Sequence, residues 1–366
     1  MRLTRRFKRR TLIIAGAVLI LAIGAGATAY AVTTSFSDVP TDYWAYNSIT
    51  KMAAQGVIQG HTDGNFGPDE FVTRAQTATF LDRSQQVCTQ CHNATTLITG
   101  KQAAWSTSLH GTGLVFIEDG STTGCTGCHS GGGFSAMVAA GQNPTQVTAG
   151  DPNPTRQDCR ACHQIHATYT QADWGLETTA PVALYAAPGN TFDGGQGNLC
   201  AVCHEPRTAF PAAVDGQVTV SAHFGPHHGP ESALLLGIGA ADAPAGTPHF
   251  HYSTVANTCV HCHMGDTANH TFLPDVSRCQ TCHPGATSFD IDGVQTKVQG
   301  MLADLKTALT TAGLLDANGN IVAGKYPEKQ AAALWNYSYI KDDKSSGVHN
   351  PPYSEAVLQA SLDLMK

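Results

Sequence analysis

The sequence predicts a mainly helical protein with extensive loops, in which a small helical module precedes a long region of little regular secondary structure. Two helical patterns flank a turn-rich loop in residues 35–83, and apolar residues recur at helical spacing in residues 292–366. Between residues 111 and 248, Gly, Pro, Thr and Ala dominate without a long periodic run. Only 13% of residues are charged, against about 25% in ordinary globular domains. Something other than a conventional core is therefore expected to hold the central region together.

Residues 1–32 are predicted to be a signal peptide or an N-terminal membrane anchor. Residues 1–10 contain six basic side chains and no acidic one, and an uncharged stretch from Thr11 to Ala31 follows. Such a stretch of about 20 residues can span a bilayer, with its basic end in the cytoplasm. The rest of the chain is expected to be exported to the cell envelope or cell surface. Cleavage after Ala31 leaves 15 basic against 28 acidic residues, and this net charge of −13 argues against nucleic acid as a partner.

Residues 33–84 are predicted to form the small helical module. They resemble an S-layer homology domain through the segments Phe36-Ser37-Asp38-Val39, Tyr43-Trp44-Ala45, Gly56-Val57-Ile58-Gln59-Gly60 and Val72-Thr73-Arg74-Ala75-Gln76. The resemblance implies non-covalent attachment to cell-wall polymer, with Trp44 and Arg74 in the family's binding positions. The family usually has three copies and this chain has one, so strong attachment would need avidity from several chains. A helical spacer without a ligand is the alternative.

All twelve cysteines belong to one repeated motif, Cys-x-x-Cys-His, and none is left over. This motif is typical of c-type haem attachment. The six motifs are Cys88/Cys91/His92, Cys125/Cys128/His129, Cys159/Cys162/His163, Cys200/Cys203/His204, Cys259/Cys262/His263 and Cys279/Cys282/His283. The sequence therefore predicts six covalently attached haem c groups in residues 85–366, which are expected to share one core.

The chemistry of c-type haem explains why these residue types recur at this spacing. Two cysteines about one helical turn apart can form thioethers to the two haem vinyl groups, and the next residue, His, is the proximal ligand of the iron. Zinc ribbons built from paired Cys-x-x-Cys segments are the alternative, but zinc bound by thiolates would leave the six histidines without a shared role.

The histidine content predicts a second imidazole for the distal side of each iron. The chain has 17 histidines, so more than six remain after the six proximal ligands are subtracted. The expected distal ligands are His110, His166, His223, His228, His251, His270 and His349, with His227 as a weaker candidate. The remaining residues, His249 and His261, are expected to be spare, and His61 is expected to be a solvated surface residue.

Two of these expectations depend on local spacing. His166 follows His163 by three residues, and on a helical turn both rings would project to one side and reach two adjacent haems. Residues 221–230 hold three imidazoles in a stiff turn, and the sequence does not rank His223 against His228.

The C-terminal region, from about residue 292 to residue 366, is predicted to contain regular helices. An amphipathic stripe is formed by Val294, Val298, Leu302, Leu305 and Leu309. Further on, the chain resembles multihaem cytochromes related to the cytochrome c nitrite reductases through Trp335-Asn336-Tyr337, Asp342-Asp343-Lys344-Ser345-Ser346-Gly347-Val348-His349-Asn350-Pro351 and Tyr353. The resemblance implies that His349 is a distal haem ligand. The Cys-x-x-Cys-Lys motif of the catalytic haem in those reductases is absent from this sequence, which argues against nitrite reduction.

These features predict a hexahaem electron carrier of the cell envelope, whose haems are mostly ligated by two histidines. The expected partners are redox proteins or an extracellular acceptor, together with cell-wall polymer, and self-association into a filament is a further hypothesis. The alternative is a multihaem reductase of a small nitrogen or sulfur oxyanion with one open haem, because an enzyme of this kind needs an iron with a free coordination position.

Overall fold

A computed structural model describes residues 35–92, 96–227 and 229–366, and the predicted signal or anchor segment lies outside these residues. The chain divides into two compact units, one ending at Thr73 and one beginning at Arg74. Within the described ranges, no helix is both long enough and apolar enough to cross a membrane.

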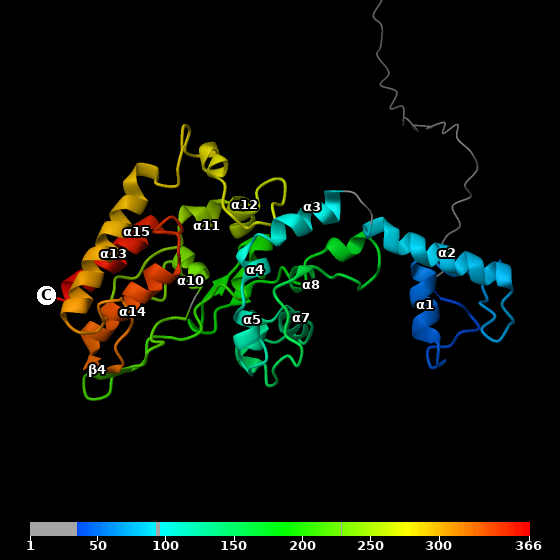
Figure 1. The fold of residues 1–366 in the computed structure, drawn as a ribbon, viewed down its shortest axis with the longest axis horizontal. Helices are drawn as coiled ribbons and strands as arrows, with labels where there is room; N and C mark the ends of the chain where they lie inside the picture. The colour runs from blue at the N-terminus through cyan, green and yellow to red at the C-terminus, as the bar shows by residue number, and fades with distance from the viewer. Residues whose placement is uncertain (1–34, 93–95, 228) are drawn as a thin grey trace, which may run out of the picture. The chain divides into compact units, whose positions relative to one another are not determined.

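The described residues are mainly helical with long loops, which confirms the predicted fold class (Figure 1). The α-helices are α1 (Tyr46–Ala54), α2 (Arg74–Cys91), α3 (Thr96–Trp105), α4 (Leu109–Thr112), α5 (Val115–Glu118), α6 (Thr126–His129), α7 (Gly131–Ala139), α8 (Cys159–Cys162), α9 (Asn198–Ala201), α10 (Glu231–Leu236), α11 (Phe250–Thr254), α12 (Cys259–His263), α13 (Val294–Thr311), α14 (Glu328–Asp342) and α15 (Pro351–Leu364). Short 3₁₀ helices are η1 (Pro144–Gln146), η2 (Gln171–Trp174), η3 (Gly195–Gly197), η4 (Val276–Thr281) and η5 (Ile291–Gly293). Two antiparallel pairs of strands are β1 (Val182–Ala183) with β2 (Thr191–Phe192), and β3 (Gln217–Val220) with β4 (Gly324–Pro327).

The N-terminal unit is built around α1 and the loop that follows it. Asp38 holds the far part of this loop, because its carboxylate accepts hydrogen bonds from the backbone N–H groups of Phe66, at 2.8 Å, and Gly67, at 2.7 Å. Burial alone would raise the pKa of Asp38, but these two donors hold it below its ordinary value. The buried core consists of Phe36, Val39, Ile49 and Ala53.

Helix α2 runs without a break from Arg74 to Cys91, past the expected module boundary at residue 84. The sequence predicts a helix only as far as Leu81, because the polar segment 82–91 lacks apolar residues at helical spacing. Helix α2 therefore also carries the cysteines of the first Cys-x-x-Cys-His motif. Of the two expected wall-binding residues, Trp44 is 88% exposed, and Arg74 is exposed at the start of α2.

The main core of the C-terminal unit forms where α13, α14 and α15 pack together, with the β3–β4 sheet against α14 (Figure 1). Three residues of the predicted stripe, Val298, Leu305 and Leu309, are completely buried on α13. Helix α14 is buried on all sides from Ala331 to Ile340, which is the pattern of a central helix.

Side chains of the tail segment hold the loop that follows α10. On α14, Trp335 donates from Nε1 to the carbonyl of Gly239 at 3.1 Å. Asn336 is completely buried and pairs with the backbone of Ala241 in both directions, accepting at 2.8 Å and donating at 2.7 Å. Asn350 donates to two further carbonyls, those of Leu234 and Thr247, at 3.0 and 3.1 Å. These three residues belong to the segments that carry the resemblance, and their hydrogen bonds hold the loop after α10 against the helical core.

Replacing Asn336 by Ala is expected to lower the free energy of unfolding by about 1–3 kcal/mol, because the buried N–H and C=O of Ala241 would lose their partner. Denaturant titration of the purified full chain should show a lower midpoint with an unchanged slope. The control is Asn318→Ala, since Asn318 is exposed in the loop after α13 and should change stability by no more than about 0.5 kcal/mol. Equal effects of the two substitutions would contradict the assigned role of Asn336.

Candidate functional site

The six Cys-x-x-Cys-His motifs share one local backbone structure, a single helical turn. The backbone N–H of the motif histidine donates to the carbonyl of the first cysteine at 2.8–3.0 Å in five motifs, those of His92, His129, His163, His204 and His283. In the sixth motif, Cys259–His263, the whole segment is helix α12. This turn brings the two sulfur atoms of each motif to one side, as attachment of both to one planar ring requires.

The twelve cysteines are all described, and none of them forms a disulfide. Across the described ranges, no group of three or more His, Cys, Asp or Glu side chains is placed to hold a metal ion. The zinc ribbons of the alternative hypothesis need four ligands, thiolates or imidazoles, around one point.

Five motif histidines each face a second histidine ring at nearly the same separation. The ring centres are 6.2 Å apart for His92 and His166, 6.0 Å for His129 and His227, 6.2 Å for His163 and His270, 6.3 Å for His204 and His110, and 6.4 Å for His263 and His349. An imidazole nitrogen binds a first-row metal at about 2.0–2.1 Å, and the ring centre lies about 1.1 Å further away. Two rings on opposite sides of one iron would thus have centres about 6.2 Å apart, and the observed pairs fit this geometry.

Several other ring contacts of histidines among the described residues are closer. His249 and His251 have ring centres 4.6 Å apart, and His110 lies 4.9 Å from the ring of Phe272. The five pairs of motif histidine and second histidine all fall within the narrow range of 6.0–6.4 Å. The remaining motif histidine, His283, is an electrostatic neighbour of His251: burial lowers the pKa of His251, and His283 lowers it further.

Hydrogen bonds at Nδ1 orient several of these rings. A backbone carbonyl can only accept, so a ring nitrogen bonded to it carries the proton, and Nε2 is left with the lone pair that a metal needs. Such bonds run from His163 to Trp174 at 2.7 Å, from His263 to Phe272 at 2.9 Å, from His270 to Ala268 at 2.7 Å and from His251 to Val348 at 2.9 Å. In these four rings Nδ1 is thus held by a backbone carbonyl, and Nε2 is the nitrogen with a lone pair available to a metal.

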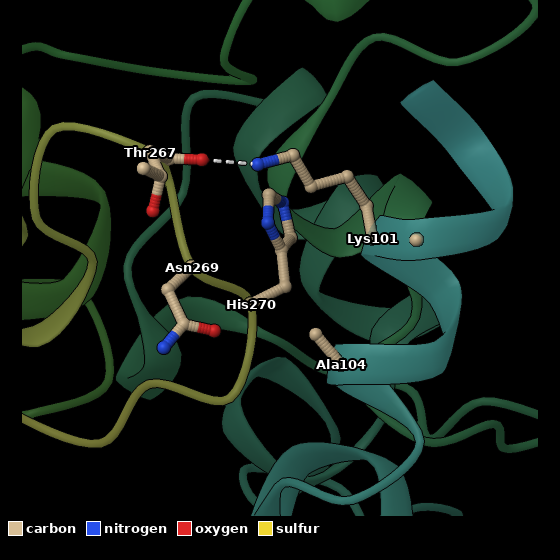
Figure 2. Close-up of a pocket in the computed structure, with 6 residues that line it drawn as sticks. Lys101, Ala104, Thr267, Asn269 and His270 are labelled. Atoms are coloured by element: carbon tan, nitrogen blue, oxygen red, sulfur yellow. Dashed lines mark hydrogen bonds between the residues drawn. The ribbon is translucent and has the colours of Figure 1, made fainter. Parts of the chain in front are cut away.

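The loop that presents His270 is tied to helix α3. Lys101 donates from Nζ to the carbonyl of Ala268 at 2.7 Å and also to the carbonyl of Thr267. A pocket of about 240 Å³ lies here between α3 and the loop, lined by Lys101 and His270 among others (Figure 2). The lysine therefore fixes the same carbonyl that orients the His270 ring.

Most of the expected distal histidines lie opposite a motif histidine. His110, His166, His270 and His349 do so, each beside a different motif, while His251 is an electrostatic neighbour of His283.

The cluster in residues 221–230 is arranged differently from the sequence expectation. Its member opposite a motif histidine is His227, the weaker candidate. His223 has an exposed side chain, and His228 lies outside the described residues.

His166 reaches its position by a turn and not by the helix that its spacing suggested. Helix α8 ends at Cys162, and His166 has the left-handed φ of 67°. The two rings nevertheless face two different histidines, because His163 lies opposite His270 and His166 lies opposite His92. Spacing alone could find the pair but not the backbone conformation between them.

Several motifs are in direct contact with one another through their cysteines. Cys203 and Cys128 are close neighbours, and so are Cys200 and Cys259, because in each pair the first thiol has a raised pKa and the second a lowered one through their mutual interaction. Cys162 and Cys203 pack against the same small apolar cluster. The fourth motif, Cys200–His204, thus lies next to the second, third and fifth motifs.

Comparison with known proteins identifies the N-terminal module. Residues 35–78 match the S-layer homology domain. Over 79 residues the chain is 37% identical to the outer membrane protein SlpA of Thermus thermophilus, covering 22% of this chain and 8% of SlpA. It is 42% identical over 48 residues to outer membrane protein alpha of Thermotoga maritima, covering 13% and 12% of the two chains, and 41% identical over 49 residues to the S-layer protein EA1 of Bacillus anthracis, covering 13% and 6%. The predicted S-layer homology domain is confirmed, and the chain spans only a small part of these relatives.

Among solved structures, the chain is similar to the crystal structure of the outer cell wall cytochrome OcwA. The TM-score is 0.48 and the sequence identity 22%, over 73% of this chain and 50% of that chain.

Proposed function

We propose that this protein is a hexahaem c-type cytochrome of the cell envelope that carries electrons between redox partners. One observation carries the proposal: motif histidines face a second imidazole at the separation that a shared iron requires. Haem bound in this way supplies a one-electron couple between ferric and ferrous iron. The chain's own residues orient the imidazoles and keep the two ligands of each pair in place.

In the proposed ligation, each motif histidine is the proximal ligand and the ring opposite is the distal ligand. Sites are numbered here by the order of the motifs along the chain. The distal ligands are His166 at site 1, His227 at site 2, His270 at site 3, His110 at site 4, His349 at site 5 and His251 at site 6. With two imidazoles at every site, no iron is left open, and this favours electron transfer over the alternative of an oxyanion reductase.

The contacts between motifs support a branched route for the electrons. Sites 1 and 3 adjoin, because their ligands His166 and His163 lie in one short loop. Site 4 adjoins sites 2, 3 and 5 through the cysteine contacts. Site 6 adjoins site 5, since Cys279 contributes, after burial, to the raised pKa of Cys262. The proposed main route is 1–3–4–5–6, with site 2 as a branch from site 4.

The S-layer homology domain supports attachment of the protein to cell-wall polymer, with the exposed Trp44 and Arg74 as proposed contacts. An extracellular acceptor or a partner cytochrome would then receive the electrons. Self-association into a filament stays a hypothesis. In the proposed ligation this chain supplies a second imidazole for every site, so a filament would not need to exchange a distal histidine between copies.

The oxidised protein is expected to contain six haems, all low-spin, because both axial positions of every iron are filled by imidazole. Haem content would be measured as pyridine haemochrome and by mass spectrometry, and spin state by quantified EPR. Fewer attached haems would contradict the hexahaem assignment. A stoichiometric high-spin haem that binds small anions would instead indicate the reductase.

A further inference from the structure

The groups that anchor the imidazoles at Nδ1 differ in charge from one site to another. At site 3 both rings are held by neutral backbone carbonyls, those of Trp174 and Ala268. At site 5 the ring of His349 is held by the carboxylate of Asp343 at 2.6 Å. At site 4 the ring of His204 forms an ion pair with Glu231 at 3.3 Å. Two adjacent sites thus have a carboxylate directly behind one ligand.

Asp343 is a buried carboxylate whose two oxygens both accept hydrogen bonds. Its side chain is completely inaccessible to solvent. One carboxylate oxygen receives His349 Nδ1–H, and the other accepts from the backbone N–H of Ser345 at 3.2 Å and from the Ser345 hydroxyl. The carboxylate therefore lies directly against the Nδ1 side of His349, and its side chain is screened little by solvent.

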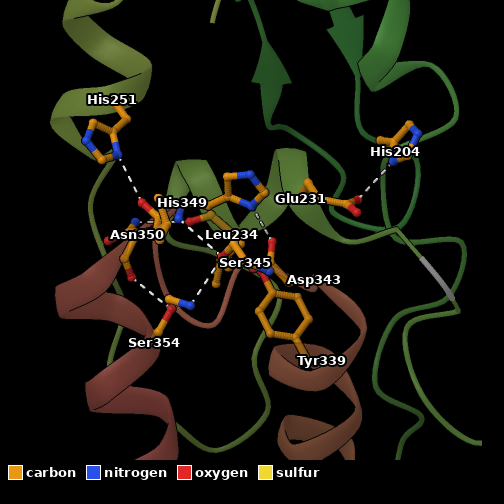
Figure 3. A network of polar contacts seen from close by, with 12 residues as sticks. His204, Glu231, Leu234, His251, Tyr339, Asp343, Ser345, His349, Asn350 and Ser354 are labelled. Atoms are coloured by element: carbon orange, nitrogen blue, oxygen red, sulfur yellow. Dashed lines mark hydrogen bonds and ion pairs between the residues drawn. The ribbon is translucent and has the colours of Figure 1, made fainter. Parts of the chain in front are cut away.

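Glu231, at the start of α10, has a position similar to that of Asp343. Burial alone would raise its pKa, but His204 and other donors hold the pKa below its ordinary value. Burial lowers the pKa of His349, but Asp343 raises it and the charge of Glu231 raises it further. Figure 3 shows His204 with Glu231 and His349 with Asp343 in one network, with His251 on the side away from His204.

We propose that Asp343 and Glu231 are positioning residues that lower the reduction potentials of the haems at sites 5 and 4, relative to the haem at site 3. A carboxylate behind an imidazole draws its Nδ1 proton and makes Nε2 a stronger donor to the iron, which favours the ferric form. A neutral carbonyl draws the Nδ1 proton less strongly, so it strengthens the bond from Nε2 to the iron less. The inference rests on the proposed haem ligation, and it implies that electrons moving from site 3 to sites 4 and 5 go uphill before they reach site 6.

The test is Asp343→Asn in the full haem-loaded protein. The amide oxygen can still accept the Nδ1 hydrogen bond while the charge is removed, but the amide NH2 then faces the backbone N–H of Ser345, so the haem content of the variant is checked first. One of the six haems is expected to show a ferric-to-ferrous ratio about tenfold lower at a fixed ambient potential, which for one electron is about 59 mV. A redox titration followed by EPR would measure the reduction potentials of the individual haems. The potential of one haem should rise, and those of the other five should be unchanged. Glu231→Gln is expected to move a different component in the same direction.

The matched control is Asp290→Asn. Asp290 accepts from the backbone N–H and the hydroxyl of Thr296 at 3.1 and 2.6 Å, much as Asp343 accepts from Ser345, but it has no imidazole partner in these bonds. All six potentials should be unchanged in this variant. A shift of equal size in the control, or unmoved potentials in both Asp343→Asn and Glu231→Gln, would overturn the proposal.

Failure of this inference is distinguishable from failure of the proposed function. If the wild-type protein lacks six low-spin haems, the ligation itself is wrong. If six low-spin haems are present and the carboxylate variants leave every potential in place, only the role of the two carboxylates is wrong. Should Asp343→Asn mature without its full haem content, Glu231→Gln decides the question at site 4, where the ion pair is longer and more exposed.

Discussion

Replacing His227 by Ala is expected to convert one of the six haems from low-spin to high-spin. The ring of His227 faces the motif histidine His129 with centres 6.0 Å apart and ring planes 60° apart, so its removal leaves the iron of site 2 with one axial imidazole. EPR and magnetic circular dichroism would measure the spin state, and the opened iron should bind cyanide or nitrite. The five other haems should keep their low-spin signals.

The matched control is His223→Ala, four residues earlier in the same turn. The His223 side chain is exposed, and its backbone N–H is bonded to the hydroxyl of Ser221 at 3.3 Å. All six haems are therefore expected to stay low-spin in this variant. A high-spin haem after His223→Ala, with none after His227→Ala, would show that the ligand assignment at site 2 is reversed.

The attachment motifs could be found in the sequence because everything they need is local. Five contiguous residues supply two sulfurs and an imidazole on one turn, and the same hydrogen bond closes that turn wherever the motif occurs. The S-layer homology domain was predictable for the same reason, since its characteristic residues lie within one short segment. Local pattern thus determined the number of expected haems and the position of the N-terminal module.

The pairing of histidines could not be predicted, because it depends on segments far apart in the chain. His204 faces His110, and His163 faces His270, across long stretches of loop. In the turn at 221–230, the ring that faces a motif histidine depends on the backbone conformation. His227 has a left-handed φ of 69° and faces His129, whereas the His223 side chain is exposed to solvent. Nothing in the residue types distinguishes the two.

The tail segment shows another limit of the sequence pattern. The resemblance to nitrite-reductase-related cytochromes drew attention to Asn336, His349 and Asn350, and it implied a role for His349 alone. In the structure the two asparagines donate hydrogen bonds to backbone carbonyls of segments distant in the sequence. Asp343 accepts a hydrogen bond from Nδ1 of His349. These roles need the tertiary contacts of α14 and α15. The relationship with the nitrite reductases itself stays a prediction.

Replacing Cys200 and Cys203 together by Ser is expected to remove the haem of site 4 and to separate the remaining haems into isolated groups. Site 4 is the junction of the proposed route, because Cys203 contacts Cys128 of site 2 and Cys200 contacts Cys259 of site 5. Without it, sites 1 and 3 keep contact with each other but lose contact with sites 5 and 6. Electron transfer falls steeply with distance, so electrons entering at site 1 should stay on sites 1 and 3.

The end of the route provides the control. Replacing Cys279 and Cys282 by Ser also removes one haem, at site 6, but leaves sites 1 to 5 connected. A photosensitiser on an engineered Gln85→Cys, exposed on α2 one turn before the first motif, would inject electrons at site 1, since all native cysteines are consumed by the haems. Under illumination with a sacrificial donor, the fast phase should reduce two of the five haems in the junction variant and all five in the end variant. If the fast phase reduced the same number of haems in both variants, electrons would reach site 5 without passing through site 4. The proposed route would then be wrong, and a second connection between sites 3 and 5 would be needed.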